Sequence, residues 1–209
     1  MTKCSPAQHD APRAGDALLI IDVQRDFLPG GALGVPGGDR VVPVLNRYLR
    51  LFAARGLPIV LSRDWHPVDH CSFRAQGGPW PAHCIAGSPG AGFAPELMLP
   101  AGCLVISKAV GASEEAYSAF EHTGLGARLK ALGCRQLFIG GLATDYCVRA
   151  SVLDALAQGF AVQLLHDAIR AVDLQPGDGA AAEQAMIVAG AALLTLDKLS
   201  PHANDPSCL

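Results

Sequence analysis

The sequence is poor in charge, and the charge that it has is scattered. Only 17% of the 209 residues are charged, the net charge is −3, and the basic residues form no run. Nucleic-acid-binding proteins usually carry a basic patch, so this pattern argues against a nucleic-acid partner. No apolar run approaches the roughly 18 residues of a membrane span, and the first ten residues lack the apolar segment of a signal peptide. We therefore predict a cytoplasmic protein without a membrane partner.

The cysteines also lack the pattern of a disulfide scaffold. There are seven of them, an odd number, and none forms a Cys-x-x-Cys motif. Thiols spread in this way through a cytoplasmic chain are expected to be reduced. Half of the residues are apolar and the mean hydropathy is +0.28, which suffices for a buried core in a chain of this length. The composition indicates a globular domain, with structural cysteines and one candidate nucleophile among them.

Short apolar runs alternate with helical patterns along the chain. We expect strands over 17–21, 58–62, 103–107, 136–140, 161–165 and 191–194, and helices over 39–55, 123–132, 144–158 and 178–189. Polar residues do not alternate within the strand runs, which is typical of parallel strands buried on both faces. The pattern predicts a three-layer α/β/α fold with a mostly parallel sheet. We expect this fold to form one domain over 16–200, between a flexible N-terminal tail (1–15) and a C-terminal tail (201–209).

Three of the predicted strands lead to reactive side chains. Asp22 follows the first strand, Lys108 follows the third, and the fourth leads to Cys147. The carboxyl ends of parallel strands share one edge of the sheet, so these groups should meet there. Asp22 can accept the thiol proton, Lys108 can stabilise anions, and Cys147 can attack. Alternatively, each of these residues only caps a loop or packs in the core.

Cys147 falls in the first turn of the helix predicted over 144–158. The positive end of a helix lowers the pKa of a thiol, so we expect a thiolate there. Free backbone N–H groups in the same turn can bind an oxyanion.

A long loop over 63–101 is rich in proline, glycine and histidine, and loops of this length are usually functional or disordered. Asp64 and His66 are two positions apart, so in extended backbone their side chains point the same way. His83 follows in the same loop, and His70 is a possible further ligand. Two imidazoles and a carboxylate suit zinc, iron or manganese. The alternative is a polar surface loop whose histidines have other partners.

Five segments together resemble the isochorismatase-like cysteine hydrolases, in particular the nicotinamidase/pyrazinamidase family. They are IIDVQRDF (20–27), DWHPVDHCSF (64–73), WPAHC (80–84), ISK (106–108) and GLATDYCV (141–148). The resemblance extends over about residues 17–195. It implies a six-stranded sheet in the order 3-2-1-4-5-6. It also implies conversion of nicotinamide to nicotinate and ammonia through a thioester, in NAD salvage, with pyrazinamide converted to pyrazinoate in the same way.

The resemblance assigns roles to individual positions. The catalytic triad is implied to be Asp22, Lys108 and Cys147. Metal ligands are implied at Asp64, His66 and His83, with His70 a fourth ligand in some members. Backbone N–H groups of Ala143 and Cys147 are implied to form the oxyanion hole, beside a cis peptide bond between Ala143 and Thr144. The walls of the ring pocket are implied to be Phe27, Trp80, Tyr117 and Tyr146.

The resemblance further implies one divalent metal ion per chain (zinc, iron or manganese), and it leaves a homo-oligomer open. The nearest alternative is a related amide or carbamoyl hydrolase that acts on a different small amide. Such enzymes generally lack the metal motif of the loop, and isochorismatase itself lacks the nucleophilic cysteine. A binding module without enzymatic activity, or a redox-sensing thiol, would be a different class of protein. We interpret His166 and Asp167, after the fifth predicted strand, as structural.

Overall fold

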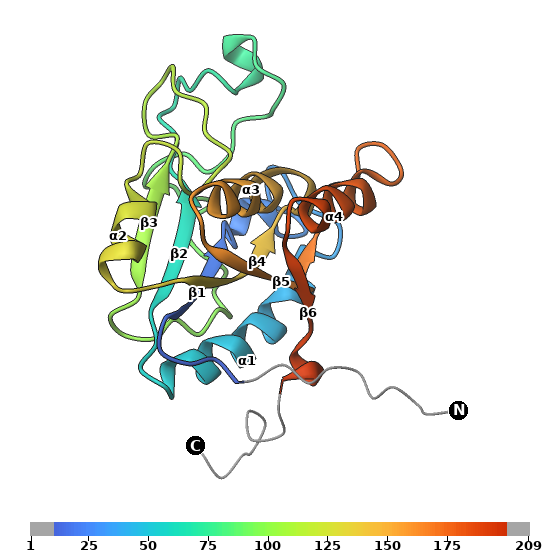
Figure 1. Cartoon of the computed structure of the whole chain (residues 1–209). Coiled ribbons are helices and arrows are strands. Elements are labelled where there is room, and N and C mark those ends of the chain that lie inside the picture. The colour runs from blue at the N-terminus through green and yellow to red at the C-terminus, as the bar shows by residue number, and fades with distance from the viewer. Residues whose placement is uncertain (1–10, 200–209) are drawn as a thin grey trace.

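The computed structural model describes residues 11–199, and a six-stranded parallel sheet forms its centre (Figure 1). The strands are β1 (Asp16–Ile21), β2 (Ile59–Asp64), β3 (Leu104–Lys108), β4 (Gln136–Leu142), β5 (Ala161–Arg170) and β6 (Ala192–Leu194). Their order is β3-β2-β1-β4-β5-β6, and every neighbouring pair is parallel. The predicted fold class and strand order are confirmed.

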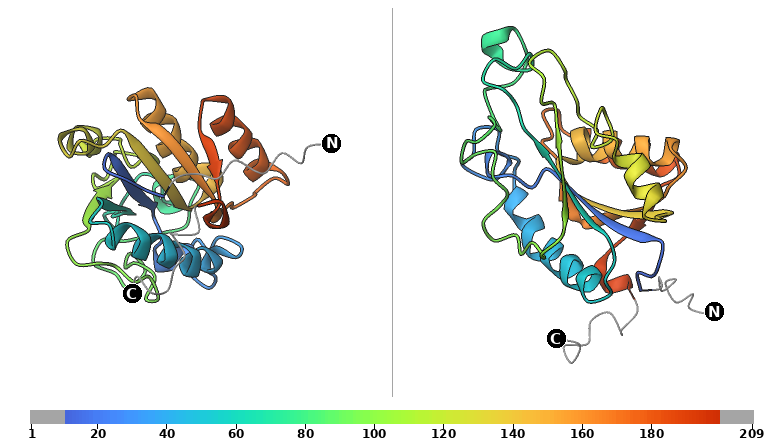
Figure 2. Two further views of the ribbon diagram at one scale, coloured as in Figure 1. Left: turned by 60° about the horizontal axis from the view of Figure 1, so that its bottom comes forward. Right: turned by 90° about the vertical axis from the view of Figure 1, so that its left-hand side faces the viewer.

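Helices cover both faces of the sheet. Between residues 11 and 199 the α-helices are α1 (Val41–Ala53), α2 (Leu125–Ala131), α3 (Arg149–Ala157) and α4 (Asp178–Val188). Figure 2 shows α1 on one face and the other three helices on the opposite face. Along β1, Leu18 and Ile20 join the core beneath α1, whereas Leu19 and Ile21 join the core on the other side. Both faces of the strand are therefore buried, which explains its uninterrupted apolar run.

Most expected elements are found with bounds shifted by one or two residues, so that Lys108 lies within β3, but two elements differ more. β5 continues to Arg170 because it resumes pairing with β4 beyond an irregularity between Ile139 and Gly141. His166 and Asp167 therefore lie within β5 and do not follow it. The helix predicted over 144–158 divides into a π-helical turn, Thr144–Val148, and α3, which begins at Arg149. Cys147 thus lies in the π-helical turn.

The parallel arrangement places the carboxyl ends of all six strands at one edge of the sheet. The long connection between β2 and β3 rises from this edge, at the top of Figure 1, and contains only a short 3-10 turn, Arg74–Gln76. Most of the two predicted tails lies outside the described residues. Within the described chain, no helix has the length and apolar character needed to cross a membrane. The cytoplasmic location and a homo-oligomeric state stay predictions.

Candidate active site

The structure brings the three strand-end residues together. Asp22 directly follows β1 and turns the chain with a φ of 47°. Lys108 ends β3, and Cys147 lies in the turn after β4. The Nζ atom of Lys108 is 3.0 Å from Oδ2 of Asp22 and 3.5 Å from Sγ of Cys147. All three residues are buried, so their charges interact with little screening by water.

Two carboxylates hold Lys108 in its charged form. Burial alone would lower the pKa of Lys108, but Asp22 and Asp64 raise it well above its ordinary value. Burial alone would likewise raise the pKa of Asp64, yet Lys108 and His66 hold it below its usual range. Lys108 is therefore an ammonium and Asp64 a carboxylate, joined by an ion pair.

Asp22 and Cys147 are both shifted toward their neutral forms. Burial raises the pKa of Asp22 despite the attraction of Lys108, and Ser62 donates a 2.7 Å hydrogen bond to its Oδ1 atom. Burial also raises the pKa of the Cys147 thiol, and the nearby carboxylates add to this shift. The pKa of the thiol is therefore raised and not lowered as expected, because burial and the nearby carboxylates outweigh the opposing attraction of Lys108. The thiol of Cys147 can donate its proton, and the carboxylate form of Asp22 can accept it, because a raised pKa makes that carboxylate a stronger base.

The structure also brings Asp64, His66 and His83 together: their ligand atoms lie within 4.8 Å of one another. The Nδ1 atoms of the two histidines face backbone carbonyls, that of Ala109 at 3.2 Å and that of Pro81 at 2.8 Å. A carbonyl only accepts, so Nδ1 carries a proton in each ring, and Nε2 is the nitrogen that can bind a metal. Histidine ligands of metals are usually oriented in this way, so the three residues fit a divalent transition metal.

His70 is not brought into this set. Its ring stacks near His66, with a centroid distance of 4.2 Å. However, its Nε2 donates to the carbonyl of Glu114 at 3.0 Å, and its Nδ1 lies 2.8 Å from the hydroxyl of Ser72. Both ring nitrogens therefore have protein partners, and His70 fastens the loop.

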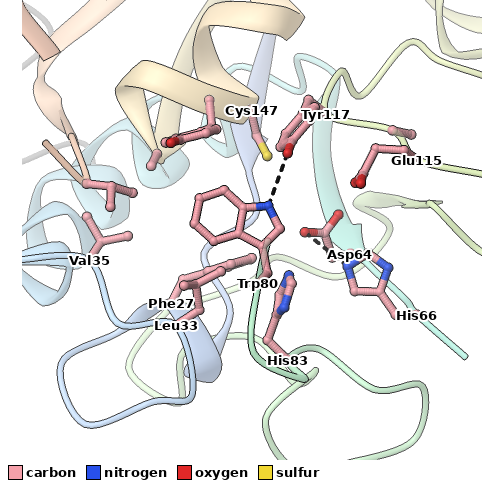
Figure 3. Close-up of a pocket in the computed structure, with 14 residues that line it drawn as sticks. Phe27, Leu33, Val35, Asp64, His66, Trp80, His83, Glu115, Tyr117 and Cys147 are labelled. Carbon is pink, nitrogen blue, oxygen red and sulfur yellow. Dashed lines mark hydrogen bonds and ion pairs between the residues drawn. The ribbon is translucent and has the colours of Figure 1, made fainter. Parts of the chain in front are cut away.

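A pocket that is partly open to solvent connects the histidines with the thiol. Figure 3 shows the Asp64 carboxylate and the Cys147 sulfur among the residues that line this pocket, with the Trp80 wall in the middle of the view. The indole N–H of Trp80 donates to the hydroxyl of Tyr117 at 3.1 Å, and its ring meets Tyr146 edge-on at 5.2 Å. Phe27 lines the pocket beside His83. The predicted aromatic residues thus surround a space suited to a flat ring.

Sequence reasoning missed part of this pocket. The additional wall residues are Leu33, Val35, Glu115, Ala116 and Val172. They come from three loops, and no motif marks them. It also missed Ser62, whose signal was only its position in the second strand.

Ala143 lines the pocket next to Cys147, as expected of an oxyanion-hole residue. The cis peptide bond, however, joins Leu142 to Ala143, one bond earlier than the predicted Ala143–Thr144. β4 ends at Leu142, so Ala143 already belongs to the turn: its carbonyl accepts from Tyr146 and Val148 N–H groups, each at 3.1 Å. The predicted position is therefore wrong by one residue.

Comparison with known proteins places these features in a family. The model of the isochorismatase domain matches residues 16–198. A nicotinamidase from Escherichia coli (strain K12) is 40% identical in an alignment 201 residues long, which covers 86% of this chain and 94% of that protein.

Two solved structures are similar to the fold. The pyrazinamidase of Pyrococcus horikoshii in complex with zinc shares 47% identity at a TM-score of 0.84, over 87% of this chain and 99% of that one. PnC1 from L. infantum in complex with nicotinate shares 36% identity at a TM-score of 0.79, over 90% and 96% of the two chains. These findings confirm the resemblance, and the chain belongs to the isochorismatase-domain family.

Proposed function

We propose that the protein hydrolyses nicotinamide to nicotinate and ammonia, and pyrazinamide to pyrazinoate, through a thioester on Cys147. The observation that carries this proposal is one aromatic pocket with a buried thiol on one side and a carboxylate–bis-histidine set on the other. The relatives named nicotinamidase and pyrazinamidase support the choice of substrate. The reaction serves NAD salvage by returning the pyridine ring as its acid.

The pocket orients the substrate before any bond changes. Trp80, Tyr146 and Phe27 offer apolar surfaces to a flat ring. Trp80 and Tyr146 hold each other through their edge-on contact, and Phe27 lies against His83. The amide carbon then lies toward Cys147. Positioning of this kind converts a bimolecular encounter into a favoured intramolecular step.

The residues of the triad divide the proton transfers. Asp22 takes the Cys147 proton as Sγ attacks the amide carbon, and backbone N–H groups of Ala143 and Cys147 stabilise the oxyanion. The C–N bond breaks as Asp22 returns the proton to the leaving ammonia, which leaves a thioester. A water molecule then attacks the thioester and loses a proton to Asp22. The C–S bond breaks, and Asp22 reprotonates Cys147. Lys108 balances the negative charge throughout.

Asp64, His66 and His83 would hold one divalent metal ion, with zinc, iron and manganese all compatible with this donor set. When bound, the ion supplies a Lewis-acidic anchor for a ring nitrogen of the substrate. His70, with both nitrogens occupied, supports the loop and is not a ligand.

Ammonia release tests the substrate. The purified, zinc-loaded protein is assayed with nicotinamide, pyrazinamide and an N-carbamoyl amino acid at equal concentrations. We expect release from the two aromatic amides and none from the carbamoyl compound. Release from the carbamoyl compound alone would contradict the proposal and favour the related amide or carbamoyl hydrolases.

A further inference from the structure

We infer that Gln24 and Asp26 are positioning residues for the metal site, because their side chains fix the backbone that carries Asp64 and His83. Both lie in the short segment that follows Asp22, and neither belongs to the donor set itself. The inference rests on the proposed function, since it requires Asp64, His66 and His83 to be metal ligands.

Gln24 acts on Asp64. It is fully buried, and its Nε2 donates to the carbonyl of Asp64 at 2.8 Å and to that of Ala91 at 3.0 Å. Its Oε1 accepts the N–H of Asp64 at 2.8 Å. Both backbone polar groups of Asp64 are thus paired with one side chain. β1 ends at Ile21, so this amide continues the pairing between the two chain segments beyond the end of the strand.

The position of Gln24 also joins two loops. The other partner of its side chain, Ala91, belongs to the part of the long loop that follows His83. The backbone of Gln24 also forms an isolated antiparallel β-bridge with Phe93 in that part of the loop. Moving Gln24 would therefore release Asp64 and the end of the His83 loop at the same time. A buried amide whose donors and acceptor are all used tolerates little displacement.

Asp26 acts on His83. Its Oδ2 accepts the N–H of Cys84, the residue after His83, at 2.7 Å. Cys84 adopts a φ of 46°, a left-handed conformation that is costly for a residue with a side chain, so the surrounding structure must enforce it. The carboxylate of Asp26 also occupies the space beside Gly90, where a Cβ atom would come within 2.2 Å of it. Asp26 is thus built into the turn that directs His83.

One segment therefore sets the geometry of both halves of the site. Asp22 faces the thiol, whereas Gln24 and Asp26 hold the chain at two of the three metal ligands. A merely structural role for Gln24 and Asp26 would lower stability without a specific loss of metal affinity. Mutation of residues that hydrogen-bond to metal ligands typically lowers the affinity for the metal by about 10- to 100-fold.

The test measures zinc affinity, by competition with a chromogenic chelator, for the full-length protein and its variants. Gln24→Met keeps the length of the side chain and removes its hydrogen bonds. We expect its zinc dissociation constant to rise about 10- to 100-fold. Asp26→Ala should show the same loss, whereas Asp26→Asn retains an acceptor for the Cys84 N–H and should bind zinc close to the wild type.

Gln136→Met is the matched control. Gln136 donates a 3.3 Å hydrogen bond to Asp16 at the opposite end of the same sheet, far from the pocket. Its zinc affinity should equal that of the wild type, and thermal unfolding of the metal-free proteins measures any general loss of stability.

The outcomes are distinct. Unchanged affinity in both Gln24→Met and Asp26→Ala would overturn the inference alone, as would an equal loss in Gln136→Met. If the wild type itself takes up no zinc, the proposed metal site fails and the inference falls with it.

Discussion

Removal of the Ser62 hydroxyl should weaken catalysis on the acid side of the pH profile. Ser62 is fully buried, and its hydroxyl donates a 2.7 Å hydrogen bond to Oδ1 of Asp22. Burial raises the pKa of Asp22, and the Ser62 hydrogen bond opposes that rise. Ser62→Ala therefore raises the pKa of Asp22 further, and the carboxylate that accepts the thiol proton forms only at higher pH.

The magnitude follows from the kind of bond. A hydrogen bond to a charged group contributes about 1.5–3 kcal/mol. Loss of this energy from the ionised form of Asp22 corresponds to about a 10- to 100-fold lower kcat/KM on the acid side of the profile. At pH values well above the pKa of Asp22 the carboxylate is present in both proteins, so the two rates should converge.

The assay is kcat/KM for nicotinamide as a function of pH. Ser151→Ala is the matched control, because Ser151 is equally buried but its hydroxyl accepts the Ala119 N–H at 2.9 Å, away from Asp22. We expect the acid limb to move to higher pH in Ser62→Ala and to stay in place in Ser151→Ala. An unchanged acid limb in Ser62→Ala would refute the role of Asp22 as the proton acceptor.

Three further predictions concern charge and metal. Lys108→Met leaves two buried carboxylates without their countercharge and should lower the free energy of unfolding by about 3–5 kcal/mol in urea titrations; a loss below about 1 kcal/mol, as for a surface pair, would contradict the buried triad. In the metal-free protein, Asp64 has a pKa below its unfolded value of 3.8, so its contribution to stability is present above that value and is lost as the pH falls through the folded pKa. In Asp64→Asn, the unfolding temperature of the metal-free protein should fall less steeply as the pH is lowered. An unaltered dependence on pH would argue against this contribution of Asp64. Dialysis against a strong chelator should abolish nicotinamide hydrolysis and added zinc should restore it; full activity in protein shown to be metal-free by elemental analysis would exclude a role for the metal.

The sheet and the strand-end residues were predictable for a physical reason. Strands buried on both faces produce uninterrupted apolar runs, and parallel pairing forces Asp22, Lys108 and Cys147 to one edge. The convergence of Asp64 and His66 was predictable as well. The two residues are two positions apart, and side chains at this spacing in extended backbone point the same way. Asp64 ends β2, and the ligand atoms of the two residues lie close together.

Other features depend on contacts between distant segments and have no local signal. The extension of β5 depends on how it pairs with β4. The π-helical turn at Cys147 is built on the carbonyl of Ala143, which accepts the Tyr146 and Val148 N–H groups. The pKa of Cys147 depends on its burial beside carboxylates from other strands, so a rule based on its own helix gave the wrong direction. The roles of Gln24 and Ser62 appear only when their partners 40 residues away are known.

The central claim is that Cys147 is the nucleophile of a nicotinamide hydrolase. Ammonia release from nicotinamide is measured for the wild type, for Cys147→Ala and for Cys134→Ala, a second buried free cysteine that does not line the pocket. We expect release by the wild type and Cys134→Ala, and none above background by a folded, zinc-loaded Cys147→Ala. Turnover by Cys147→Ala at a rate near that of the wild type would contradict the central claim.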